Sequence, residues 1–156
     1  MITVANANTV YTAIYEAISQ QEIKTGYLQQ MLEQQRLSMA DYVYSRLLSG
    51  GKLSPQDLAF LEREDASYIV AVASLDKVQD VDVILEQNKP DGDIFTVELY
   101  REGYLALICR FKGAADEILT RACMLLENAE MGVSSEEKSL RNLRVCFEEA
   151  CTKLRE

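Results

Sequence analysis

The chain has 156 residues, of which 48% are apolar and 26% are charged, a composition typical of a folded globular protein and not of a disordered one. Its formal net charge of −9 argues against nucleic acid or an anionic membrane surface as the main partner, because binding to these depends on clustered Lys and Arg. We expect a single domain over residues 1–156, in which residues 1–65 could form a helical subdomain.

The start of the chain and its cysteines indicate a compartment. Residues 1–10 lack the basic and apolar regions of a secretory signal, and no apolar stretch is long enough to span a membrane. We therefore expect a cytoplasmic protein that has no membrane partner. The four cysteines have no C-x-x-C spacing, so we expect free thiols rather than disulfides.

About three helices are predicted in the first part of the chain. Apolar residues at helical spacing predict a first helix around residues 10–18. A second, glutamine-rich helix extends from about residue 22 to Leu48, where Ser-Gly-Gly offers a glycine C-cap. A third helix begins in "LSPQDL", with Ser54 as the N-cap and Pro55 at the first helical position.

The middle of the chain predicts a change from helix to sheet. Residues 66–80 contain strand-favouring residues, but their spacing favours continued helix, which is the interpretation we adopt. Residues 81–87, "IFTVELY" and "YLALICRF" then predict three strands of a small antiparallel β-meander, over about residues 81–111. The segment "KPDGD" is predicted to be the turn between the first two strands, and "REG" the hairpin loop before Tyr104.

Two carboxyl-terminal helices follow the predicted sheet. The first has an apolar face over residues 115–129 and is predicted to end at Gly132. The second is predicted to open at Ser134, with Glu137 completing a capping box. The fold class is therefore α+β and mostly helical, with a small sheet between helices.

The residues needed for common catalytic and metal sites are absent from the sequence. There is no histidine, so the usual general base and the Ser-His and Cys-His pairs are excluded. No glycine-rich phosphate-binding motif occurs, and the aspartates lack the pattern of a calcium-binding loop. We therefore predict no cofactor, no metal ion and no enzyme activity.

Three functional hypotheses remain. The first is a non-enzymatic protein–protein interaction protein (adaptor, chaperone-like, regulatory or inhibitory) that forms a homodimer. The others are a small-ligand sensor with a pocket between the sheet and its flanking helices, and an enzyme that works through carboxylates or cysteine.

The first hypothesis predicts an interface. Apolar rows at heptad-like spacing occur in the second and last helices, and a polar residue such as Gln35 in a row can set the register between two helices. The same rows are also typical of amphipathic helices with a narrow core stripe. The partner would bind through a basic or apolar segment, because residues 51–100 carry a net charge of −7 (four basic, eleven acidic). The candidate interface residues are Tyr27, Gln35, Met39, Tyr42, Leu143 and Phe147.

Overall fold

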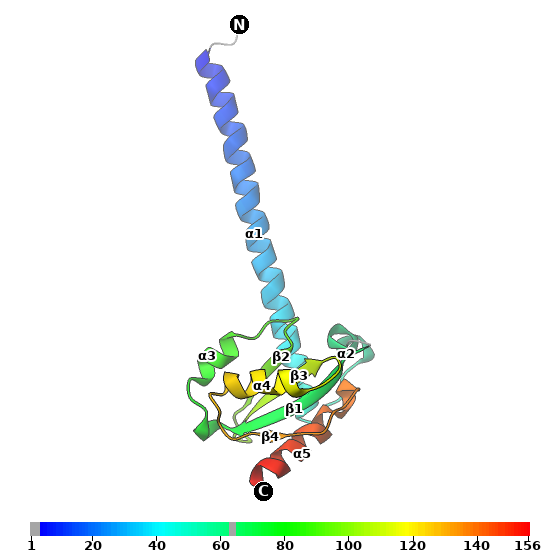
Figure 1. The fold of residues 1–156 in the computed structure, drawn as a ribbon. Coiled ribbons are helices and arrows are strands. Elements are labelled where there is room, and N and C mark those ends of the chain that lie inside the picture. Colours follow the sequence, from blue (N-terminus) through cyan, green and yellow to red (C-terminus); the bar gives the residue numbers. More distant parts are fainter. Residues whose placement is uncertain (1–3, 63–64) are drawn as a thin grey trace. The chain divides into compact units, whose positions relative to one another are not determined.

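A computed structural model describes residues 4–62 and 65–156, and its contacts divide the chain into two compact units, residues 1–36 and 37–156. The described part of the first unit is a single helix, α1 (Val4–Leu48), whose last turns belong to the second unit. The prediction of separate helices around residues 10–18 and 22–48 is therefore wrong (Figure 1). Residues 19–21 contain no glycine or proline that would stop a helix. Gly26 lies inside α1, where glycine costs about 1 kcal/mol without ending the helix.

The end of α1 and the start of α2 are as predicted. After Leu48, Gly50 has a φ of 80°, which glycine adopts without strain. The helix α2 (Pro55–Leu61) begins after Ser54, whose hydroxyl accepts a hydrogen bond of 3.2 Å from the backbone N–H of Asp57. These signals involve residues only a few positions apart, so local chemistry determines them.

Within the described residues, the sheet has four antiparallel strands in the order β2-β3-β1-β4. They are β1 (Ser67–Ser74), β2 (Ile94–Leu99), β3 (Tyr104–Phe111) and the short β4 (Gly132–Val133). The predicted β2–β3 hairpin is confirmed: Gly103 has a φ of 83° and donates a 2.9 Å hydrogen bond to the carbonyl oxygen of Leu99.

The predicted helix over residues 66–80 is wrong, because most of this segment is β1 and only the short 3-10 helix η1 (Leu75–Lys77) follows it. The strand is buried on both faces, with Tyr68, Val70 and Val72 toward one core cluster and their neighbours toward the other. A strand buried on both faces has no alternation of apolar and polar residues, so its sequence resembles that of a buried helix.

The predicted strand over residues 81–87 is also wrong, because this segment is the helix α3 (Val81–Glu86). In such a short segment both periods can be found, because Val81, Val83 and Leu85 alternate while Val81, Ile84 and Leu85 have helical spacing. The three residues at helical spacing are the ones that pack in the core cluster on this face of the sheet. The segment "KPDGD" is the predicted turn, with a 3.0 Å hydrogen bond from the N–H of Gly92 to the carbonyl oxygen of Lys89. It connects α3 to β2 instead of joining two strands.

Two carboxyl-terminal helices are present, but their predicted bounds differ from the structure. The helix α4 (Asp116–Leu125) ends before Gly132, which lies in β4. The last helix, α5 (Leu143–Arg155), begins after the 3-10 helix η2 (Leu140–Asn142) and not at Ser134. Ser134 instead bonds to β1, because its backbone N–H donates to the carbonyl oxygen of Val70 over 2.9 Å.

The sheet has a core on each face. The end of α1 with α2 and α5 covers one face, and α3 with α4 covers the other (Figure 1). The arrangement confirms the predicted α+β class with a small antiparallel sheet, in a mostly helical chain.

Candidate functional site

A row of mainly apolar residues follows one face of α1. Its positions are separated alternately by three and four residues, the spacing of the seam in a two-stranded coiled coil. Seven of the ten positions are apolar or aromatic, and three are polar. The α1 row consists of Tyr11, Ile14, Ile18, Gln21, Thr25, Leu28, Leu32, Gln35, Met39 and Tyr42.

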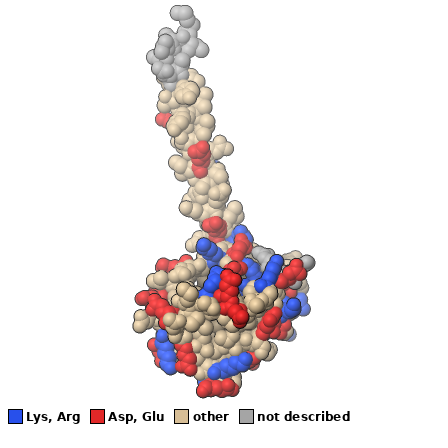
Figure 2. Space-filling view, viewed as in Figure 1, with Lys and Arg blue, Asp and Glu red and all other residues tan. Residues whose placement is uncertain are grey.

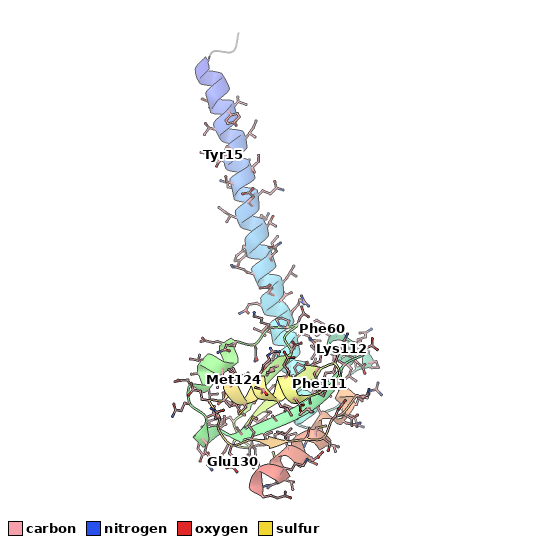
Figure 3. The ribbon with its side chains drawn as sticks, viewed as in Figure 1. Tyr15, Phe60, Phe111, Lys112, Met124 and Glu130 are labelled. Atoms are coloured by element: carbon pink, nitrogen blue, oxygen red, sulfur yellow. The ribbon has the colours of Figure 1, made fainter. Side chains whose placement is uncertain are left out.

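The large apolar side chains of the α1 row within residues 9–36 are exposed. Tyr11, Ile14, Ile18, Leu28 and Leu32 have exposed fractions between 50% and 74%. Further exposed apolar residues flank the row, including Tyr15, which Figure 3 shows projecting from the helix. A row of this length that stays in contact with water is typical of an interaction surface and not of a monomer's ordinary exterior.

Few charges stabilise this part of α1. Residues 9–36 contain five charged side chains, and Figure 2 shows few charged residues along the helix. Helices that stand alone in water depend on many ion pairs along their length, and most protein helices gain their stability from packing of an apolar face. The composition of residues 9–36 therefore favours a helix that packs against a partner.

The last turns of α1, in the second unit, use a different face for their own core. Ala40, Val43 and Leu47 are buried there, whereas Tyr42 is 50% exposed and Met39 is partly buried. At 3.6 residues per turn, the buried face is centred about 110° from the row that contains Met39 and Tyr42. The core of the second unit therefore leaves most of this end of the row uncovered.

The six predicted interface residues fall into three groups. Gln35, Met39 and Tyr42 belong to the α1 row. Tyr27 is 61% exposed on α1 but lies beside the row. Leu143 and Phe147 are 0% and 2% exposed and belong to the core cluster between α5 and the sheet, so their side chains already pack within this chain.

The upstream part of the row, from Tyr11 to Ile18, was not among the predicted residues. The signal that would have identified it is the unbroken spacing of three and four from Tyr11 to Tyr42, which is visible only when residues 10–48 are treated as one helix.

A second feature is a cleft of about 690 Å³ in the second unit, at the end of β3 and beside α4. Figure 3 shows Phe111 and Lys112 at this position. Asp93, which lines the cleft, lies near two guanidinium groups. Its Oδ2 atom is 3.4 Å from Nη1 of Arg121, and its Oδ1 atom is 4.0 Å from Nη2 of Arg110.

The cysteines offer little reactivity where they are buried. Burial raises the pKa of Cys109 to about 12 and also raises the pKa of Cys146 and of Cys151. These three thiols stay protonated at neutral pH, and a thiolate is the form that attacks substrates or binds metals. All four cysteines are free, as predicted.

Within residues 4–62 and 65–156, no three Cys, Asp or Glu side chains are grouped as a metal site would require. None of the helices in this part of the chain combines the length and the apolar character needed to cross a bilayer.

No protein-family model matches the chain, and no curated protein matches it in sequence.

Proposed function

We propose that this chain is a non-enzymatic protein–protein interaction protein that self-associates through the α1 row, with two copies of α1 forming a parallel coiled coil. The observation that carries the proposal is the exposure of the row's large apolar residues over residues 9–36. Covering them removes apolar surface from water, which stabilises association by roughly 25 cal/mol for each Å².

The charged residues beside the row are compatible with a second copy of the same helix as the partner. In a parallel pair, a side chain beside the seam contacts a residue of the other helix about five positions away. The contacted residue comes later in the chain for Lys24 and earlier in the chain for Glu22 and Arg36, which lie on the other side of the seam. Glu22, Lys24 and Arg36 would each then face an uncharged residue of the other copy. Two copies therefore meet without like-charge repulsion, which would destabilise other pairings.

The polar members of the row favour one alignment. In a parallel pair without any shift, Gln21 and Gln35 each face the same residue of the other helix and can exchange hydrogen bonds. A shift by one heptad would place Gln35 against Leu28, leaving an amide in an apolar layer. Polar residues at such positions are known to set register at some cost in stability.

We also propose that the protein is located in the cytoplasm. All four cysteines are free, and the reducing cytoplasm keeps thiols in this state.

A charge placed in the row tests the proposal. Leu28→Glu should shift the full-length chain from dimer to monomer in analytical ultracentrifugation, because the carboxylate would be buried between the helices. Gln30→Glu adds the same charge on the opposite face of α1 and should leave the dimer intact. A wild-type chain that is monomeric at tens of micromolar, or equal effects of the two substitutions, would sink the proposal.

Cysteine cross-linking tests the direction of pairing. In a Cys123→Ser background, which removes the partly exposed native thiol, Gln21→Cys and Gln35→Cys should each give an interchain disulfide on mild oxidation. In an antiparallel pair only a residue at the two-fold axis can meet its own copy, so at most one variant would cross-link. That result would refute the parallel arrangement while leaving self-association in place.

A further inference from the structure

The cleft beside α4 is lined by charges of both signs. Its described lining includes three basic residues, Arg110, Lys112 and Arg121. It also includes four acidic residues, which are Glu62, Asp65, Asp93 and Glu117. The cleft has the size of a small-molecule site, since such sites enclose roughly 300–1,000 Å³.

The guanidinium groups on the β2 side of the cleft are loosely paired. Charge-assisted hydrogen bonds between arginine and carboxylate are about 2.7–2.9 Å long. Asp93 is 3.4 Å from Arg121 and 4.0 Å from Arg110, so its carboxylate makes a full-strength bond with neither. Arg110 donates one hydrogen bond of 3.0 Å to the carbonyl oxygen of Asp91, and its side chain is 14% exposed. Two arginines with remaining donors therefore converge on one side of the cleft.

The acidic residues Glu62 and Asp65 lie on the other side. The sheet order β2-β3-β1 explains this separation, because Asp93 precedes β2 whereas Asp65 precedes β1, and β3 with Arg110 lies between them. A ligand that carried only negative charge would meet the arginines at one side and be repelled at the other. A ligand with one positive and one negative group finds opposite charges at both sides.

The floor of the cleft is apolar. Phe111, at the end of β3, is 8% exposed, and Ile118, in α4, is 4% exposed. Both belong to the core cluster under α4, so the floor is held in place by packing and does not depend on the ligand. An apolar group of the ligand can lie on these side chains while its charged groups contact the rim.

We propose that this cleft binds a small zwitterion of the amino-acid class that has an apolar side chain. The carboxylate lies against Arg110 and Arg121, taking over contacts that Asp93 now makes loosely. The ammonium group lies toward Glu62 and Asp65, and the side chain rests on Phe111 and Ile118. This site is separate from the α1 row, so the two proposals stand or fall independently.

The test uses L-leucine as the probe and follows the backbone amides of the full-length chain by NMR. Saturable shifts are expected for residues 110–112 and 117–121. Two analogues serve as matched controls: 4-methylpentanoate lacks the ammonium group, and isopentylamine lacks the carboxylate. Each should bind about tenfold more weakly or worse, because each loses hydrogen bonds to charged groups.

Substitutions at the rim complete the test. Arg121→Gln changes a side chain that is 52% exposed and should weaken leucine binding about tenfold without unfolding the chain. Arg101→Gln, in the hairpin loop at the opposite end of β3, is the control and should leave binding unchanged. The inference is overturned if leucine shifts no amides up to about 20 mM, if both analogues bind as tightly as leucine, or if the two arginine variants bind equally.

Discussion

Residues 9–36 and residues 37–156 differ in the exposure of their large apolar side chains. In the second unit, apolar residues from both faces of the sheet are covered by helices of the same chain. In residues 9–36, apolar residues at equally regular spacing stay half exposed or more. The second unit therefore has what it needs to fold by itself, whereas the stability of α1 should depend on a partner and on protein concentration.

The largest expected effect is that of a substitution at Gly132, where β4 packs tightly against α5. Gly132→Ala would place a Cβ atom against the carbonyl oxygen of Ala150 and 2.7 Å from the backbone nitrogen of Leu154, so α5 would have to move away from β4. We expect the free energy of unfolding of the second unit to fall by about 4 kcal/mol. Urea unfolding followed by far-UV circular dichroism measures it.

The matched control is Gly26→Ala in α1, where nothing lies within 4 Å of the added Cβ atom. We expect this substitution to raise helix stability by about 0.5–1 kcal/mol, since alanine is the better helix former. If both substitutions had similar effects, the contrast in packing between the two units would be wrong.

Replacing one leucine in each unit with alanine compares the two units directly, because Leu143 and Leu28 both belong to helices. Leu143 is fully buried in the second unit, and Leu143→Ala should lower its free energy of unfolding by about 3 kcal/mol through lost contacts and a cavity. Leu28 is 50% exposed in the α1 row, and Leu28→Ala should leave the unfolding of the second unit unchanged while weakening the proposed dimer. Unfolding curves at two protein concentrations separate these effects, and a large loss of second-unit stability in Leu28→Ala would contradict the comparison.

A polar contact at the sheet edge should have an intermediate effect. The side chain of Asn88 donates to the carbonyl oxygen of Thr96 over 2.8 Å and accepts from its backbone N–H over 2.8 Å and from its hydroxyl over 2.9 Å. It thus satisfies backbone groups on the outer edge of β2, as a neighbouring strand would. Asn88→Ala should cost about 1–2 kcal/mol of unfolding free energy.

Gln87→Ala changes the exposed neighbouring residue and serves as the control, with an expected effect within about 0.5 kcal/mol. Chemical denaturation of the two variants side by side provides the measurement. Equal stabilities would show that the Asn88 contacts contribute nothing to the edge of β2.

Features that depend on nearby residues could be predicted from the sequence. The cap at Ser54, the turn in "KPDGD" and the hairpin loop with Gly103 all depend on neighbours within a few positions, and each of these local structures is present. The turn in "KPDGD" was nevertheless expected between two strands, whereas it follows the helix α3. The periodicity of apolar residues was a less reliable guide to whether a segment is helix or strand. Residues 66–80 and 81–87 were assigned the wrong state, because a strand buried on both faces shows no alternation and a six-residue helix is too short to show its own period.

The candidate sites show the same limit. Gln35, Met39 and Tyr42 could be predicted as members of a row, but regular spacing does not reveal whether a second element of the same chain covers that row. Leu143 and Phe147 have equally regular spacing and are buried. The cleft residues come from separate segments that only the strand order brings together, and no local pattern marks them.

The smallest expected effect concerns a partly exposed carboxylate on α5. Glu149 Oε1 accepts a hydrogen bond from the hydroxyl of Ser135 and lies 3.1 Å from Nζ of Lys153. These contacts, with that from Ser135 first, hold the pKa of Glu149 below its usual value of 4.5. A pKa that is lower in the folded state stabilises the fold above pH 4.5, and this contribution is lost as the pH falls through the folded-state pKa.

Glu149→Gln keeps an oxygen that can accept from Ser135 but removes the charge. Because the Glu149 side chain is 34% exposed and its charge is therefore partly screened by water, we expect the variant to be less stable than wild type by under about 0.5 kcal/mol at pH 7. The difference should shrink as the pH falls below 4.5 and disappear in acid. Glu156→Gln at the end of the chain controls for the change in net charge. A stability difference that persists in acid would assign the role of Glu149 to packing and not to its charge.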